Sequence, residues 1–393
     1  MAGAGISARC PSPLTPEASL LPSRILIATT VFLAVVSLSF TAPAAAHTGT
    51  PKPGPTAAVL TTAVTSPNNL EVRKGHVLVA DSYIDGVIGR VNADGTLTPV
   101  VSPADGVTGL AVSRDGTLAY SYTIARGPPV HVIASGLVIK GSGGSTVTAD
   151  TFAYERAINP DHGVLYGIPN ANRCVIDALW PMRIPAYFTG RDDSGARSVA
   201  AYGRDFIVAD AGGNTLLRIT RAGKISVLAI LPPQPLTFTA ELAAKYGLPE
   251  CVVGLTYNFE PVPTDVEVGK DGYVYVTTRA GGPDGLDLGA RGKVYRVNPY
   301  NGEAKELASG LAGATNLALS GGRIYVVEAD AGRISVLKRG VVSAYLNLPG
   351  VVAVEGGAHG SLYASTEWTA VTPDGSLLQP SVVRISIHKG WRH

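Results

Sequence analysis

The chain has 393 residues, of which 46% are hydrophobic and only 16% are charged, and it contains 46 glycines and 28 prolines. Abundant turn-forming residues with a moderate apolar content are typical of an all-β protein built from many short strands. The formal net charge of +2, without a cluster of basic residues, argues against a nucleic-acid partner.

Residues 1–46 have the features of a secretory signal peptide. Arg24 precedes an apolar stretch, and the three alanines at 44–46 supply a small-residue cleavage pattern. The stretch is short for a membrane span and lacks a basic flank, which favours a cleaved signal peptide. A signal anchor is the alternative. We expect cleavage near Ala46 and a secreted, extracellular or cell-envelope protein without a membrane span in its mature chain. Residues 47–56 are then a Pro-rich, mobile leader.

A repeated pattern begins at residue 69. It consists of a strand, a Gly turn, a second strand that ends in Ala-Asp, a third strand, an Asp-Gly turn and a fourth strand. The clearest copy covers residues 197–231. In the second copy, the later strands are looser and are expected at 130–134 and 146–152. The other copies begin near residues 107, 264, 315 and 352, and the turns include Asp94-Gly95, Asp115-Gly116, Asp271-Gly272, Asn301-Gly302 and Asp374-Gly375.

Four short strands per repeat of this length predict a β-propeller. We count six blades, within a single domain of residues 57–393. The last repeat lacks a fourth strand, while residues 57–64 form a strand that belongs to no repeat. The N-terminal strand is therefore expected to complete the last blade and close the ring, which removes an exposed sheet edge. Seven blades are the alternative if residues 159–191 contain a degenerate blade.

Two insertions, residues 159–191 and 232–263, interrupt the repeat. The second contains a short helix predicted at 240–246, capped by Thr239. Each insertion holds one cysteine, Cys174 or Cys251. In an exported protein this predicts a disulfide between them, with a pair of free buried thiols as the alternative.

The chain resembles the ScyD/ScyE family of exported actinobacterial and cyanobacterial proteins. The resemblance covers about residues 67–387, includes the insertion element AYERAINPD, and is densest in VADAGGN, LPPQPLTF, CVVGLTYNFEPVPTDVEVGKDGYVYVTT and GATNLAL. Members of that family are similar to NHL-repeat and gluconolactonase-like propellers with six blades, which favours six blades here. The resemblance brings no established catalytic residues.

Polar residues recur where each first strand begins and each second strand ends. In a propeller these positions converge on one mouth of the central channel. Carboxylate and amide oxygens could form a ring there that holds a calcium-like divalent cation. The alternative is that the acidic residues are turn formers, bonded to backbone amides of the Gly loop that follows. The candidate residues are Asn69, Asp81, Asp210, Asp265, Asn316, Glu328 and Glu367.

No compact catalytic motif is present, so the catalytic residues are unknown and we favour a binding or scaffold protein over an enzyme. Its partner is expected to be a small molecule, a peptide or a component of the cell envelope, bound on the face that carries the insertions. The alternative is a metal-dependent hydrolase or lactonase that uses the carboxylate and asparagine ring. The protein is expected to be a monomer.

Overall fold

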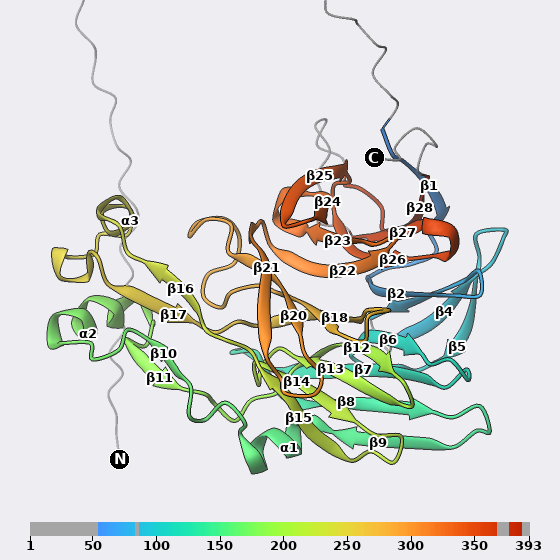
Figure 1. The fold of residues 1–393 in the computed structure, drawn as a ribbon, viewed down its shortest axis with the longest axis horizontal. Coiled ribbons are helices and arrows are strands. Elements are labelled where there is room, and N and C mark those ends of the chain that lie inside the picture. Colours follow the sequence, from blue (N-terminus) through green and yellow to red (C-terminus); the bar gives the residue numbers. More distant parts are fainter. Residues whose placement is uncertain (1–53, 83–85, 368–376, 387–393) are drawn as a thin grey trace, which may run out of the picture. The chain divides into compact units, whose positions relative to one another are not determined.

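The computed structural model describes residues 54–82, 86–367 and 377–386, which belong to one compact unit, Lys52–His393. The predicted signal peptide, most of the predicted leader and the Asp374-Gly375 turn lie outside the described residues. The described strands form seven four-stranded antiparallel sheets (Figure 1). No described helix has the length and apolar character needed to cross a membrane.

Six of the seven sheets are blades that follow one another along the chain. Blade 1 contains β2 (Pro67–Arg73), β3 (His76–Asp81), β4 (Val87–Val91) and β5 (Leu97–Val101). Blade 2 contains β6 (Val107–Val112), β7 (Leu118–Arg126), β8 (His131–Lys140) and β9 (Thr146–Asp150). Blade 3 contains β12 (Ala196–Tyr202), β13 (Asp205–Asp210), β14 (Thr215–Ile219) and β15 (Ile225–Ile230).

The second half of the ring repeats this order until the last blade. Blade 4 contains β18 (Pro263–Val268), β19 (Val274–Thr278), β20 (Gly292–Val297) and β21 (Ala304–Leu311). Blade 5 contains β22 (Ala314–Ser320), β23 (Arg323–Glu328), β24 (Arg333–Lys338) and β25 (Val341–Asn347). Blade 6 contains β26 (Val351–Gly356), β27 (Leu362–Thr366), β28 (Ser381–Ser386) and, from the other end of the chain, β1 (Thr56–Thr61).

The ring is closed as the sequence predicts. The first strand of each blade contacts the first strands of its two neighbours, including β26 against β2. Strand β1 pairs antiparallel with β28, so that Ala58 lies opposite Arg384. Thr61 also donates a hydrogen bond to the carbonyl of Gly95 in blade 1, with 2.6 Å between the two oxygens. The N-terminal strand therefore ties the last blade to the first.

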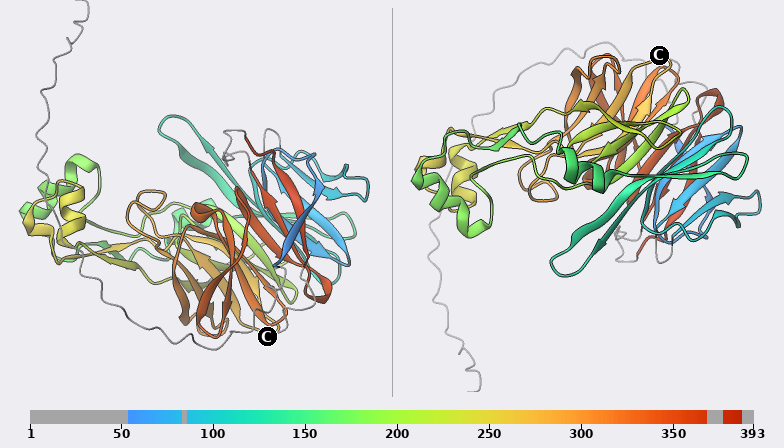
Figure 2. Two further views of the ribbon diagram at one scale, coloured as in Figure 1. Left: turned by 90° about the horizontal axis from the view of Figure 1, so that it is seen from above. Right: turned by 90° about the horizontal axis from the view of Figure 1, so that it is seen from below.

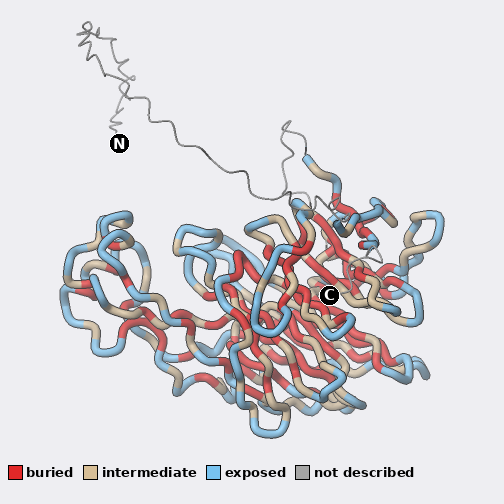
Figure 3. The backbone as a smooth tube through the Cα atoms, turned by 45° about the horizontal axis from the view of Figure 1, so that its top comes forward, coloured by how far each residue is buried: buried red, intermediate tan, exposed pale blue. Residues whose placement is uncertain are grey.

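The core lies between blades. Successive residues of β13 point to opposite faces of their sheet: Phe206 and Val208 pack against blade 2, and Ile207 and Ala209 pack against blade 4. A strand buried on both faces has a continuous apolar sequence, which explains the run FIVA. Figure 3 shows the same pattern as buried strands with exposed turns.

The turns have the predicted chemistry. Gly95 and Gly272 have φ angles of +82° and +79°, a region that residues with a Cβ rarely adopt. The carboxylate of Asp94 accepts a hydrogen bond from the amide of Thr96 at 3.0 Å, and that of Asp271 accepts one from Tyr273 at 3.3 Å. These contacts stabilise the Asp-Gly hairpins.

The seventh sheet belongs to the two insertions and not to the ring. It contains β10 (Leu165–Gly167), β11 (Tyr187–Thr189), β16 (Gln234–Thr237) and β17 (Thr256–Phe259), in the order β11-β10-β17-β16. The seven-blade alternative is therefore wrong, because the first insertion pairs with the second insertion. Figures 1 and 2 show this sheet and its helices as a lobe at one side of the blades.

Helices complete the lobe. They are α2 (Arg173–Leu179) and α3 (Ala240–Lys245), and the hydroxyl of Thr239 accepts a hydrogen bond from the Leu242 amide, which confirms the predicted cap. Helix α1 (Thr151–Ile158) lies between blade 2 and the lobe. The strand predicted at 146–152 is therefore two residues too long, because Asp150 ends β9 and caps α1.

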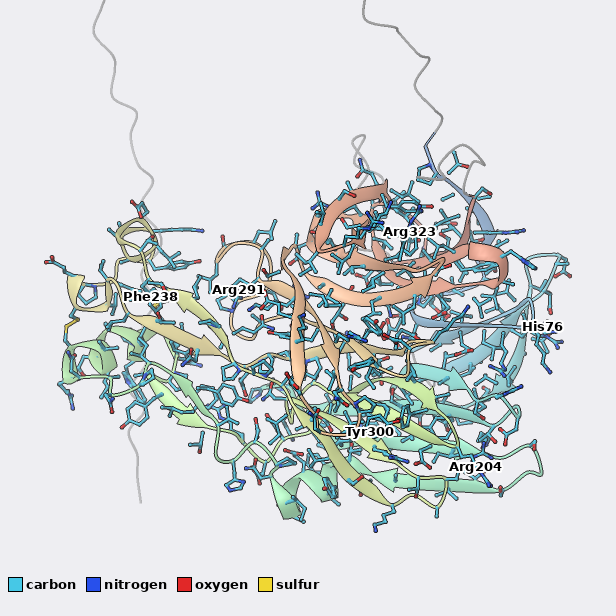
Figure 4. All side chains as sticks on the ribbon, viewed as in Figure 1. His76, Arg204, Phe238, Arg291, Tyr300 and Arg323 are labelled. Carbon is cyan, nitrogen blue, oxygen red and sulfur yellow. A yellow bond between two sulfur atoms is a disulfide. The ribbon has the colours of Figure 1, made fainter. Side chains whose placement is uncertain are left out.

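The structure contains the predicted disulfide between Cys174 and Cys251, whose Cα atoms are 6.5 Å apart. It joins α2 to a 3₁₀ helix, η2 (Glu250–Val252), beside a core of its own that includes Leu179, Phe238 and Val252 (Figure 4).

Because the lobe core is separate from the blade cores, loss of the disulfide should loosen the lobe first. We expect the double variant Cys174→Ser/Cys251→Ser to be cleaved by trypsin in the lobe at least about tenfold faster than the parent, while the blades stay protected. Mass spectrometry of the fragments measures this. Cleavage spread equally over blades and lobe would contradict a separate lobe core.

Candidate functional site

The mouth face is the side of the ring on which each first strand begins and each second strand ends. At its centre is a cavity of about 280 Å³. One residue at the start of each first strand lies in a β-bulge, where the register to the second strand shifts. Bulges re-aim a side chain, and all six bulge residues line the cavity: Asn68, Thr108, Arg197, Thr264, Thr315 and Val352.

The threonines of this ring are fixed by neighbouring blades. Thr108 donates its hydroxyl to the carbonyl of Ala196 at 2.6 Å, and Thr264 donates to the carbonyl of Ala314 at 2.9 Å. Each hydroxyl oxygen keeps acceptor capacity after this bond. The cavity wall is therefore preorganised and polar.

Arg197 is the charged member of the bulge ring. Its side chain is exposed to the cavity, and no hydrogen bond or ion pair with another described residue holds its guanidinium. The surrounding protein lowers the pKa of Arg197 through desolvation, and Arg279 adds repulsion, while the carboxylate of Glu367 opposes both. Arg279 itself is held by Asp330, with a nitrogen–oxygen distance of 3.0 Å.

Three predicted site residues, Asn69, Asp265 and Asn316, form the next layer of the channel. Each side-chain oxygen accepts a hydrogen bond from a backbone amide of the following blade. The donors are Leu110 to Asn69 at 3.4 Å, Leu317 to Asp265 at 2.8 Å and Val354 to Asn316 at 2.7 Å. Asp265 also accepts a hydrogen bond from the hydroxyl of Ser198. These residues tie neighbouring blades together around the channel.

Asp81, Asp210 and Glu328 end the second strands of blades 1, 3 and 5, and their carboxylates bond to the segment that leads into the first strand of the same blade. Asp81 accepts the amide of Ser66 at 2.6 Å, Asp210 that of Gly195 at 2.7 Å and Glu328 that of Ala312 at 2.8 Å.

Asp210 also accepts a hydrogen bond from the Gly loop that follows it, through the Gly213 amide at 3.1 Å. Burial raises the pKa of Glu328, but hydrogen bonds, above all from Arg333, outweigh it and hold that pKa below its ordinary value. The seven predicted residues thus have three kinds of setting: hydrogen bonds between blades, hydrogen bonds within a blade and, for Glu367, the wall of the cavity, which Asn69 and Asn316 also line.

A third channel layer contains three glutamates, one each from β2, β18 and β26. Glu71 and Glu267 follow Asn69 and Asp265 by two residues, so that they share their strand face, and Glu355 has the equivalent position in blade 6. Desolvation raises the pKa of Glu71 to about 7, and desolvation together with repulsion from neighbouring carboxylates, including Asp265, raises the pKa of Glu267 and Glu355 well above the ordinary value.

A second acidic cluster lies where the lobe joins blade 3. Glu155 of α1 is fully buried, and neither oxygen of its carboxylate has a hydrogen-bond partner among the described residues. Burial, with the charges of Asp210 and Asp161, raises the pKa of Glu155 to about 8. A Cβ on Gly213 would lie 2.9 Å from a Glu155 oxygen, which explains the glycine in this loop.

Asn214 connects this cluster to the second insertion. Its side-chain amide donates to Asp161 at 3.0 Å and to Glu260 at 3.3 Å, and its oxygen accepts the Val262 amide at 3.3 Å. Within the described ranges, no three side chains of His, Cys, Asp or Glu are arranged to hold a metal ion.

Comparisons with known proteins support the fold. No protein-family model and no curated protein match the chain. A solved structure from Thermus thermophilus, described as an oxidoreductase of the glucose dehydrogenase type, aligns with a TM-score of 0.50 at 16% identity, over 85% of this chain and 100% of its own.

Two other solved structures are similar to a comparable degree. A gluconolactonase from Xanthomonas campestris has a TM-score of 0.49 at 10% identity, over 85% of this chain and 90% of its own. Virginiamycin B lyase from Staphylococcus aureus has a TM-score of 0.44 at 16% identity, over 85% of this chain and 99% of its own. The similarity is to six-bladed β-propellers as a fold.

Proposed function

We propose that the protein is an exported propeller of the ScyD/ScyE type that binds a small, hydroxylated organic acid at the mouth of its channel. The observation that carries the proposal is Arg197, which a bulge places on the wall of a cavity of about 280 Å³ and whose guanidinium has no hydrogen bond or ion pair with another described residue. A guanidinium pairs strongly with a carboxylate, because its planar fork can donate two parallel, charge-assisted hydrogen bonds.

The rest of the wall fits hydroxyl groups. The threonine oxygens accept hydrogen bonds, and Glu367 supplies a carboxylate on the same wall. A neutral sugar would offer the Arg197 guanidinium no carboxylate, and a purely apolar ligand would displace water from the polar wall without replacing its hydrogen bonds. The size of the cavity is near the lower end for small-molecule sites.

The geometry favours binding over the metal-dependent hydrolase alternative. The side-chain oxygens of Asn69, Asp265 and Asn316 already accept hydrogen bonds from backbone amides of neighbouring blades, and within the described ranges no three side chains of His, Cys, Asp or Glu are placed to hold an ion together.

Arg197→Gln tests the site. The probes are lactate, tartrate, gluconate and glucuronate, each paired with its neutral alcohol or sugar. We expect at least one acid to raise the melting temperature of the parent protein, and the variant to bind it at least about tenfold more weakly by calorimetry.

The matched control is Arg204→Gln, an exposed arginine at the opposite end of blade 3 (Figure 4). It should bind as the parent does. Equal binding of an acid and its neutral counterpart, or an unchanged affinity in Arg197→Gln, would contradict the proposal.

A further inference from the structure

A second cavity, of about 970 Å³, lies between blades 4 and 5. Its wall includes three hairpin turns: residues 269–271 between β18 and β19, 320–322 between β22 and β23, and 338–340 between β24 and β25. In antiparallel blades these turns lie at the end opposite the mouth face. We call this cavity the basic groove, and it is separate from the channel mouth.

The floor of the basic groove is apolar. Leu307, Leu319 and Ile324 line it and are only partly buried, and beneath them Val294 and Leu317 are fully buried in the core between the two blades. The edge of the inter-blade core is therefore exposed to solvent here. Apolar surface that stays exposed in a concave site is a common mark of ligand binding.

The rim is strongly cationic. Among the described residues that line the groove, five are basic and one, Asp271, is a carboxylate, although the whole chain has a net charge of only +2. Asp271 is engaged by Arg296 at 2.9 Å and by the hydroxyl of Tyr275 at 2.9 Å. The five basic residues are Lys270, Arg296, Arg323, Lys338 and Arg339.

We propose that the basic groove binds a free anionic amphiphile, a molecule with one acidic group and an apolar chain or ring system. The apolar part would cover the leucines of the floor, and the acidic group would lie among the cations of the rim. The apolar floor favours a ligand with an apolar part over a fully hydrophilic anion, and the cationic rim favours an anion over a neutral hydrocarbon. Figure 4 labels Arg323, which is on the rim.

The probe is dodecanoate below its micelle concentration, measured by calorimetry against the parent protein. We expect saturable binding of one molecule, with 1-dodecanol and acetate each binding at least about tenfold more weakly. Equal binding of dodecanol would overturn the role of the rim, and equal binding of acetate would overturn the role of the floor.

Two matched variants locate the site. Arg339 and Lys74 are both exposed hairpin residues, with φ angles of +52° and +50°, and both are on the face opposite the mouth, in blades 5 and 1. Lys270→Glu/Arg339→Glu should weaken dodecanoate binding about tenfold. Lys74→Glu should leave it unchanged, and all variants should melt like the parent.

Two outcomes would overturn the proposal. Equal loss of binding in the double variant and in Lys74→Glu would show a general charge effect. Capture of the protein by phosphatidylglycerol vesicles, without binding of monomeric dodecanoate, would show a membrane-surface site in place of one for a free molecule.

Discussion

A chain that begins at Ala63, and therefore lacks β1, should melt at least about 10 °C below one that begins at Gly54, or lose its cooperative transition altogether. The truncation exposes the hydrogen-bonding edge of β28, removes the Thr61–Gly95 bond and uncovers the core between blades 6 and 1. Calorimetry of the two chains measures this difference. Because both chains lack residues 1–53, they differ only in residues 54–62.

A circularly permuted chain distinguishes two effects of the truncation: the opening of the ring and the mere absence of residues 54–62. When residues 54–62 follow the C-terminus of the truncated chain through a flexible linker, the same strand can pair with β28, and we expect most of the melting temperature to be recovered. A truncated chain that melts like the longer one would show that β1 does not close the ring.

Glu155→Gln should make the protein more stable at alkaline pH. The buried carboxyl of Glu155 has an ordinary pKa of 4.5 and a folded-state pKa of about 8. Between these values the folded state binds more protons than the unfolded state, so the free energy of unfolding falls as pH rises from about 4.5 to 8. Above about pH 8 the contribution of Glu155 no longer changes. The four carboxylates that face Glu155 and raise its pKa are Asp210, Asp161, Asp193 and Asp192.

The variant removes this titration and keeps the shape of the side chain. At pH 9 we expect its free energy of unfolding to exceed that of the parent by about 1–3 kcal/mol, with little difference at pH 4.5. Urea unfolding at both pH values measures the change. Glu303→Gln, an exposed carboxyl in a blade 4 hairpin, is the control and should show no such dependence. A Gln variant that loses stability at pH 9 would mean that the charged carboxylate has a partner.

The blades and their closure could be predicted because their signals are local. The Asp-Gly turns, the alternating runs and the unpaired N-terminal strand are each visible within a few residues. The seventh sheet could not be predicted in the same way: β10 and β11 have three residues each, and Gly167 pairs with Asn258, which lies in the other insertion.

The polar residues around the channel could be predicted in part. Asn69 and Asp265 lie at the channel, but their side-chain oxygens accept hydrogen bonds from backbone amides of the following blade. A single repeat of the sequence does not reveal such a contact, because it depends on how the next blade packs. Arg197 was missed because a bulge, invisible in a single repeat, turns it into the channel. Aligning the six repeats on their first strands would have placed it beside Thr108 and Thr264. Glu155 lies in the AYERAINPD element, which the family resemblance had singled out.

The central claim is that the channel mouth, organised around Arg197, is the functional site. A crystal structure with the acid that stabilises the protein most would test it most directly. We expect the carboxylate of that acid within hydrogen-bonding distance of the Arg197 guanidinium and its hydroxyl groups against the threonine ring. An acid bound in the lobe or between two blades, with the channel mouth unchanged, would contradict the claim.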